Sequence, residues 1–93
     1  MQIEQQAPAL SPEERYLARH ALGLDNRPGG RSYRNRYFVC GRSGVWKIWN
    51  GLVERALADC SEDGKCFSLT RAGAELALEA GESLDPEDFP EKD

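Results

Sequence analysis

Apolar residues recur at helical spacing near the start of the chain. Leu17, Ala21 and Leu24 occupy positions i, i+4 and i+7, so a helix would place them on one face. The preceding residues, Ser11-Pro12-Glu13-Glu14, form a capping box with proline at the first helical position. Gly23 suits the end of such a helix, and Arg19 and His20 would complement the dipole of its last turn. The pattern predicts a helix that begins after Ser11 and ends at Gly23.

Two further helices are predicted from the same kind of pattern. The first runs from about residue 43 to residue 58, with Lys47, Asn50 and Glu54 on its polar face. Gly51 in its middle costs roughly 1 kcal/mol relative to alanine, so it marks either close packing or a break into two shorter helices. The second is capped by Thr70 and runs from residue 71 to about residue 80. The apolar positions are Val45, Ile48, Trp49, Leu52, Val53 and Ala56 in the first, and Leu76, Ala77 and Ala80 in the second.

Between the helices, shorter runs of aromatic and β-branched residues predict strands. Tyr37, Phe38 and Val39 indicate a strand from about residue 36 to residue 40. Asp63-Gly64 marks the tip of a hairpin whose strands cover about residues 59–61 and 65–69. If the loop holds three residues, Cys60 and Cys66 stand opposite each other. A cross-strand disulfide is then geometrically conceivable, although a reducing cytoplasm disfavours it.

The order of these elements is helix, strand, helix, hairpin, helix. It predicts an α+β domain in which three helices pack on a small antiparallel sheet. The 93 residues leave room for one domain only. We expect residues 1–9 to be a flexible lead-in, residues 10–81 to form the domain, and residues 82–93 to be an acidic, largely irregular tail. Phe89 in this tail could dock on the rest of the chain.

Part of the sequence resembles a winged-helix domain. LVERALA and KCFSLTRAGAELAL, which lie between about residues 52 and 78, resemble its second half: a helix, a short wing hairpin and a further helix. A winged helix has two helices between its first strand and its wing. Here only about 16 residues occupy that interval, so the element that would enter a major groove is missing or very short.

A second resemblance covers most of the chain. YLARHALGL, RSYRNRYFV, LVERALA and FSLTRAGAELAL, in this order, look like a group of small uncharacterised proteins encoded by tailed phages and prophages. The resemblance implies an origin. It carries no assigned activity and no functional residues.

No group of residues has the pattern of a catalytic or metal site. His20 is the single histidine, so no serine or cysteine has a recognisable histidine partner, and a surface position at a helix end suits it better. His20 and the three cysteines lack the close ligand pairs of zinc sites. Gly29-Gly30 lacks the spacing of a phosphate-binding loop. The sequence predicts a non-enzymatic protein without metal or other cofactor and with no evident small-molecule substrate.

The sequence also predicts where the protein acts. No apolar run reaches the roughly 18 residues of a membrane-spanning helix. The first ten residues, MQIEQQAPAL, lack the basic and apolar regions of a secretory signal. An odd number of cysteines, three, argues against a disulfide framework. These features predict a cytoplasmic protein with no membrane partner, in the host cytoplasm if a phage encodes it.

Charge is distributed unevenly along the chain, whose formal net charge is −4. Residues 26–53 contain five arginines, one lysine and no acid, whereas residues 79–93 contain seven acids and one lysine. NRPGGRSYRNRY, at residues 26–37, combines four of these arginines with two tyrosines. The candidate binding residues are Arg27, Arg31, Tyr33, Arg34, Arg36, Tyr37, Arg42, Trp46 and Lys47.

Three interpretations of this basic segment remain open. The arginines could neutralise phosphates while Tyr33 and Tyr37 stack on bases, but the acidic net charge counts against a dedicated nucleic-acid-binding protein. They could instead be solvated and paired with the chain's own carboxylates. The favoured interpretation is a protein partner, which includes a second copy of the chain, because arginine and tyrosine are enriched at interface hot spots. An exposed Trp46 beside the arginines would strengthen it. The sequence thus predicts a small binding protein, with a nucleic-acid-binding regulator as the alternative.

Overall fold

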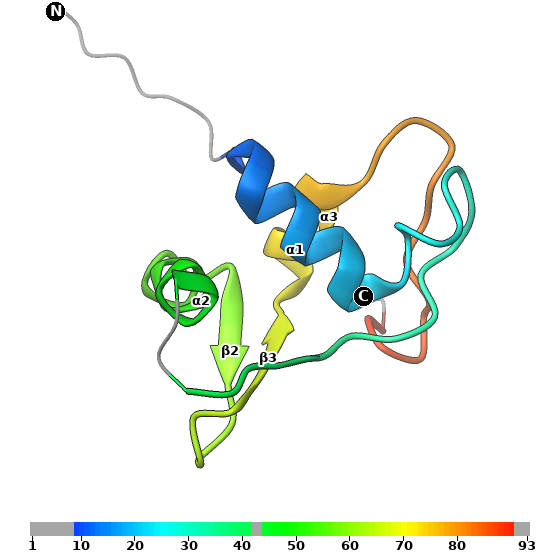
Figure 1. Ribbon diagram of the computed structural model, residues 1–93. Helices are drawn as coiled ribbons and strands as arrows, with labels where there is room; N and C mark the ends of the chain where they lie inside the picture. Colours follow the sequence, from blue (N-terminus) through cyan, green and yellow to red (C-terminus); the bar gives the residue numbers. More distant parts are fainter. Residues whose placement is uncertain (1–8, 42–43, 91–93) are drawn as a thin grey trace, which may run out of the picture.

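The computed structural model describes residues 9–41 and 44–90. Within them, three helices and a three-stranded antiparallel sheet of order β1-β3-β2 form an α+β fold, which confirms the predicted fold class (Figure 1). The elements are α1 (Pro12–Leu22), β1 (Tyr37–Phe38), α2 (Gly44–Glu54), β2 (Ala58–Cys60), β3 (Cys66–Leu69) and α3 (Arg71–Ala77). Helices α1 and α3 pack against each other, while α2 lies beside β2.

Helix α1 begins and ends as the sequence predicts. The Glu14 N–H donates to Ser11 Oγ at 3.1 Å, and the Ser11 N–H donates to Glu14 Oε1 at 2.9 Å, so both halves of the capping box form. Gly23 ends the helix in the left-handed region, with φ 83°. A Cβ at this position would also come within 2.3 Å of the Tyr33 ring. Glycine is therefore required here for both the backbone angle and the close approach of the ring.

Helix α2 is shorter than the sequence predicts, because it ends at Glu54 and not near residue 58. The Ala56 N–H donates to Val53 O at 3.0 Å and the Leu57 N–H donates to Leu52 O at 2.9 Å. These two bonds form a Schellman cap, whose left-handed position is usually glycine. Ala56 occupies it with φ 63°. The sequence carries no glycine at this point, so the end of the helix gave no local signal.

The hairpin also differs from the prediction by one residue. Cys60 pairs with Phe67, and the Ser61 N–H donates to Cys66 O at 2.8 Å, so the loop holds four residues and not three. Cys60 then shares a face of the sheet with Phe67, and Cys66 points to the other face. The proposed disulfide geometry is wrong: Cys40, Cys60 and Cys66 are all free thiols.

One face of the sheet packs on the core and the other is open. Trp49 of α2 is fully buried and stacks on Phe67 at 5.5 Å between ring centroids, and it also contacts the tilted ring of Tyr37 at 5.5 Å. Leu22 and Leu52 complete this centre from α1 and α2. The alternation of side chains along β1 and β3 turns the residues next to Tyr37 and Phe67 away from the core. These outward residues are Phe38, Cys66 and Ser68.

Residues 82–90 contain no helix or strand but pack closely on the rest of the chain. The Ser32 N–H donates to Ser83 O at 2.9 Å, and the Ser83 N–H donates to Gly30 O at 3.2 Å. Phe89 is 5% exposed and its carbonyl accepts a bond from the Arg71 guanidinium. The packed unit therefore extends past residue 81, and this segment runs beside the loop that follows α1 (Figure 1).

A buried ion pair fixes this C-terminal segment. The Arg19 guanidinium donates to both oxygens of Glu82 at 2.6 and 2.7 Å and to Ala77 O at 2.9 Å. Glu82 also accepts the Gly29 N–H at 2.9 Å and the Glu79 N–H at 2.8 Å, and its side chain has no exposed surface. The hydrogen bonds from Arg19 lower the pKa of Glu82 to about 2, against burial, which acts to raise it.

Replacing Ala56 tests the unusual cap of α2. We expect Ala56→Gly to raise the free energy of unfolding by roughly 0.5–1 kcal/mol, because glycine removes the left-handed strain of a Cβ. The matched control is Ala72→Gly, at an exposed position of α3, which should lower stability by a similar amount. Urea unfolding measures the change in the free energy of unfolding for both variants. If both changes have the same sign, the strained cap is contradicted.

Replacing Glu82 tests the buried ion pair. Glu82→Gln should cost about 3 kcal/mol at neutral pH, since it leaves the buried Arg19 charge without its partner. Because the folded-state pKa of Glu82 lies below the ordinary 4.5, the stabilisation is present above pH 4.5 and is lost as the pH falls toward 2. The difference between wild type and variant should therefore shrink over this range in urea unfolding.

The control for this experiment is Glu79→Gln. The Glu79 carboxylate lies 3.9 Å from Arg19 and its side chain is 57% exposed, so its replacement should change stability little. A Glu82→Gln penalty that stays constant from pH 5 to pH 2 would contradict the role of the Glu82 charge.

Candidate binding surface

The basic segment has a fixed main chain. Residues 23–36 connect α1 to β1 without helix or strand. The Tyr33 N–H donates to Leu22 O at 3.1 Å, and the Arg36 N–H donates to Ala21 O at 3.2 Å. The last turn of α1 therefore supplies the acceptors that hold this segment in place.

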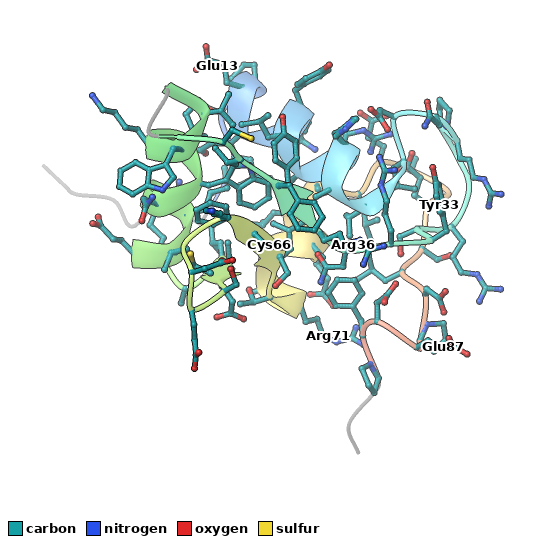
Figure 2. All side chains as sticks on the ribbon, turned by 60° about the horizontal axis from the view of Figure 1, so that its bottom comes forward. Glu13, Tyr33, Arg36, Cys66, Arg71 and Glu87 are labelled. Carbon is teal, nitrogen blue, oxygen red and sulfur yellow. The ribbon has the colours of Figure 1, made fainter. Side chains whose placement is uncertain are left out.

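Two buried or half-buried polar side chains fix the segment from its inner side. Ser32 is 1% exposed, and its Oγ accepts the Asp85 N–H at 2.9 Å. The Asn35 amide donates to Leu69 O at 3.0 Å and accepts the Leu69 N–H at 2.8 Å, which extends the hydrogen bonding of β3. The main chain is thus anchored on both sides while Tyr33 and Arg36 lie on the outside (Figure 2).

Tyr33 lies between two of the predicted arginines. The guanidinium carbons of Arg27 and Arg34 lie 4.8 and 5.4 Å from its ring centroid, within the range of cation–π contacts. Arg34 also donates from Nε and Nη2 to the His20 carbonyl at 3.1 and 2.7 Å. Tyr33 remains 42% exposed. The arrangement orders two cationic groups around one accessible aromatic ring.

The arginines of this segment have no carboxylate partner among the described residues, unlike several arginines elsewhere. Arg27, Arg31, Arg34 and Arg36 form no ion pair within residues 9–41 and 44–90. The ion pairs of the described part are instead made by other arginines, namely Arg19 with Glu82 and Glu79, Arg55 with Glu14, and Arg71 with Glu75. Glu82 is the buried carboxylate of the acidic C-terminal part. Because it pairs with Arg19, it does not neutralise the arginines of the basic segment.

The predicted residues of α2 lie apart from this segment. Figures 1 and 2 place α2 and the loop after α1 at opposite sides of the molecule. Trp46 is half-buried and lines a hollow with Val39 and the hairpin tip, and Lys47 is exposed on the same helix. The structure therefore does not bring Trp46 and Lys47 together with Arg27 and Arg31. Arg42 lies outside the described residues.

Helix α2 offers few groups that could read a DNA groove. It is the one helix between β1 and β2 in the described chain, where a winged helix has two. The Asn50 amide donates to Trp46 O at 2.9 Å, and Arg55 is held by Glu14 at 3.1 Å. Lys47 and Glu54, which are exposed, have opposite charges.

Tyr37 has a different environment from the one predicted. Its half-buried ring contacts the His20 ring edge-on at 5.4 Å and Trp49 at 5.5 Å, so it forms part of the core wall. Beside it, an open hollow of about 350 Å³ is lined by His20, Arg34, Arg36, Tyr37 and Phe38, and we call it the basic hollow. Phe38 is 67% exposed and was not among the candidate binding residues, because the sequence used the aromatic run only to predict a strand.

A second hollow lies between α1 and α2. This apolar groove, of about 430 Å³, is lined by Pro12, Glu13, Tyr16, Leu17, Tyr37, Val45 and Ile48. Tyr16 is 64% exposed there. Sequence reasoning missed the groove because it depends on how the two helices diverge. The one available signal was Tyr16, which falls beside the apolar face of α1.

Neither a metal-binding cluster nor a membrane-spanning helix is found among the described residues. Across residues 9–41 and 44–90, no three histidine, cysteine, aspartate or glutamate side chains gather to bind a metal ion. In the same part of the chain, no helix has the length and apolar character needed to cross a membrane. Comparison of the chain with protein-family models, curated proteins and solved structures found no match.

Single alanine substitutions should separate the outward arginines from the structural ones. Arg31→Ala and Arg36→Ala should each change the free energy of unfolding by less than about 0.5 kcal/mol, because neither guanidinium forms an ion pair in the described fold. Arg19→Ala should cost about 3 kcal/mol, because it leaves Glu82 buried and unpaired. Urea unfolding of the three variants tests this contrast, and a large loss for Arg31→Ala or Arg36→Ala would show that these arginines serve the fold.

Proposed function

We propose that this chain is a small non-enzymatic binding protein that acts on a protein partner through its Arg/Tyr-rich segment. The observation that carries the proposal is the set of four exposed or half-exposed arginines, 27, 31, 34 and 36, that no carboxylate of the described chain neutralises. Tyr33 and Phe38 are exposed among them. Arginine and aromatic side chains are enriched at the hot spots of protein interfaces.

Nucleic acid is the second candidate, favoured by Tyr33, an exposed ring between two arginines, which is an arrangement that can stack on a base. Three features weigh against it. The formal net charge is −4, Arg27 and Arg34 already cover part of the Tyr33 ring, and α2 presents little positive charge. A protein partner therefore accounts better for this surface.

The proposed setting is the cytoplasm of a bacterial host. It rests on the resemblance to small tailed-phage and prophage proteins. The three free thiols, Cys40, Cys60 and Cys66, fit a reducing compartment.

Titration with DNA and capture of proteins test the choice of partner class. Labelled single-stranded and duplex DNA, titrated at low and moderate salt, should show no binding to the wild-type chain. Proteins from a nuclease-treated bacterial extract should be retained by the immobilised wild type and lost on the double variant Arg31→Glu and Arg34→Glu. The matched control, Lys47→Glu with Lys65→Glu, makes the same change in net charge away from the segment and should retain them.

Two outcomes would contradict the proposal. DNA binding that falls steeply with salt and disappears in Arg31→Ala plus Arg34→Ala would assign the surface to nucleic acid. Equal retention of extract proteins by wild type, double variant and control would show that the arginines take no part in protein binding.

A further inference from the structure

The basic hollow and the apolar groove are neighbours, because Tyr37 lines both. Helix α1 runs along them: Glu13, near its start, lines the groove, and His20, near its end, lines the basic hollow. Glu13 and His20 are seven positions apart along the helix, which corresponds to a rise of roughly 10 Å. Figure 2 shows Glu13 and Arg36 well separated. The two hollows therefore form one surface whose ends carry opposite charge.

The wall between the hollows is held in place. Tyr37 contacts His20 and Trp49 through its ring, and its strand pairs with β3 opposite Phe67. The His20 Nδ1 lies 2.6 Å from Asp25 Oδ2, so the imidazole is itself fixed. A surface built on such a divider is formed before a partner arrives, which lowers the entropic cost of binding.

Exposed aromatic side chains mark this surface. Three large hydrophobic residues of the described chain are strongly exposed: Tyr16, Tyr33 and Phe38. Tyr16 lines the apolar groove and Phe38 lines the basic hollow, while Tyr33 contacts Arg34 at the hollow's edge. Exposed apolar side chains that gather beside charged groups are typical of interaction sites.

We infer that the two hollows bind one continuous segment of a partner protein, with apolar side chains in the groove between α1 and α2 and carboxylates that meet Arg34 and Arg36. The inference rests on the proposed function and adds the chemistry of the partner. Charge complementarity sets the direction of the segment: its acidic end faces the basic hollow, and Glu13 disfavours further acid at the groove end. A nucleic acid would place phosphates over an apolar groove that contains Glu13 and no lining cation.

Peptides selected without bias test this inference. The full-length chain is immobilised and a displayed library of random peptides is selected on it, and a selected peptide is then synthesised with a fluorophore. The selected sequences should combine apolar residues with adjacent aspartate or glutamate. In fluorescence anisotropy, we expect Arg36→Glu and Tyr16→Ala each to lower the affinity for the peptide about tenfold, as for hot-spot residues.

The controls keep the result specific to the surface. Lys65→Glu makes the same charge change as Arg36→Glu on the hairpin, at a residue that lines neither hollow, and it should leave affinity within about twofold. Tyr16 is 64% exposed, so Tyr16→Ala should stay folded, which circular dichroism checks. A second groove variant, Tyr16→Arg, places a bulky cation at the same position and should also lower the affinity for the peptide.

The outcomes distinguish the inference from the function on which it rests. Arg36→Glu could lower the affinity for the peptide while both Tyr16 variants bind it normally. The groove is then not part of the site and the inference is overturned, although the proposed function stands. If every selected peptide binds normally to Arg36→Glu and to the double variant Arg31→Glu plus Arg34→Glu, the proposed function fails as well. If the peptides carry no acidic residues yet depend on Tyr16, the inferred acidic character of the partner segment is wrong.

Discussion

The arrangement of this small protein depends on the pair formed by Arg19 and Glu82. A charge without exposed surface is costly unless its hydrogen-bonding positions are used. Each carboxylate oxygen of Glu82 accepts one bond from the Arg19 guanidinium and one from a main-chain amide, that of Glu79 for Oε1 and that of Gly29 for Oε2. The pair joins the end of α1 to the end of α3, where Ala77 O accepts from the same guanidinium. It also holds the C-terminal segment against the loop that follows α1, in addition to the burial of Phe89 in the hydrophobic core.

This pair explains why the basic segment faces outward. Once Glu82 is engaged by Arg19, residues 82–85 lie beside residues 29–32, and main-chain bonds through Ser83 fix the loop. Ser32 is buried against Asp85, so the residues on either side of it are directed to the exterior. The guanidinium groups of Arg31 and Arg36 then project from an ordered backbone without a carboxylate of their own among the described residues. An ordered backbone lowers the entropic cost of any binding through these cations.

The sequence predicted local features whose residues have one usual structure. It missed local features whose residues allow more than one structure, and features that depend on distant residues. The capping box at Ser11 forms because its partner lies three residues away, and the arginines of the candidate site were visible as a run of unpaired positive charge. The end of α2 was missed because Ala56 takes a conformation that is normally glycine's. The hairpin register was wrong by one residue, since a loop of three or four residues fits the same Asp-Gly signal. Phe38 and Tyr16 were missed because their exposure depends on which face of a strand or helix the core covers.

The distribution of charge also limits what the surface can bind. In physiological salt, charges more than about 8 Å apart are largely screened, so the net charge of −4 matters less than the groups near the contact. Those groups include Asp25 beside His20 and Glu13 in the groove, which confine the positive region to a narrow patch. A duplex contacted through about six to ten phosphates needs a much longer cationic track. The partner proposed above, a short acidic and apolar protein segment, suits a patch of this size next to an apolar groove better, because it needs only a few cations and gains the rest of its affinity from apolar contact.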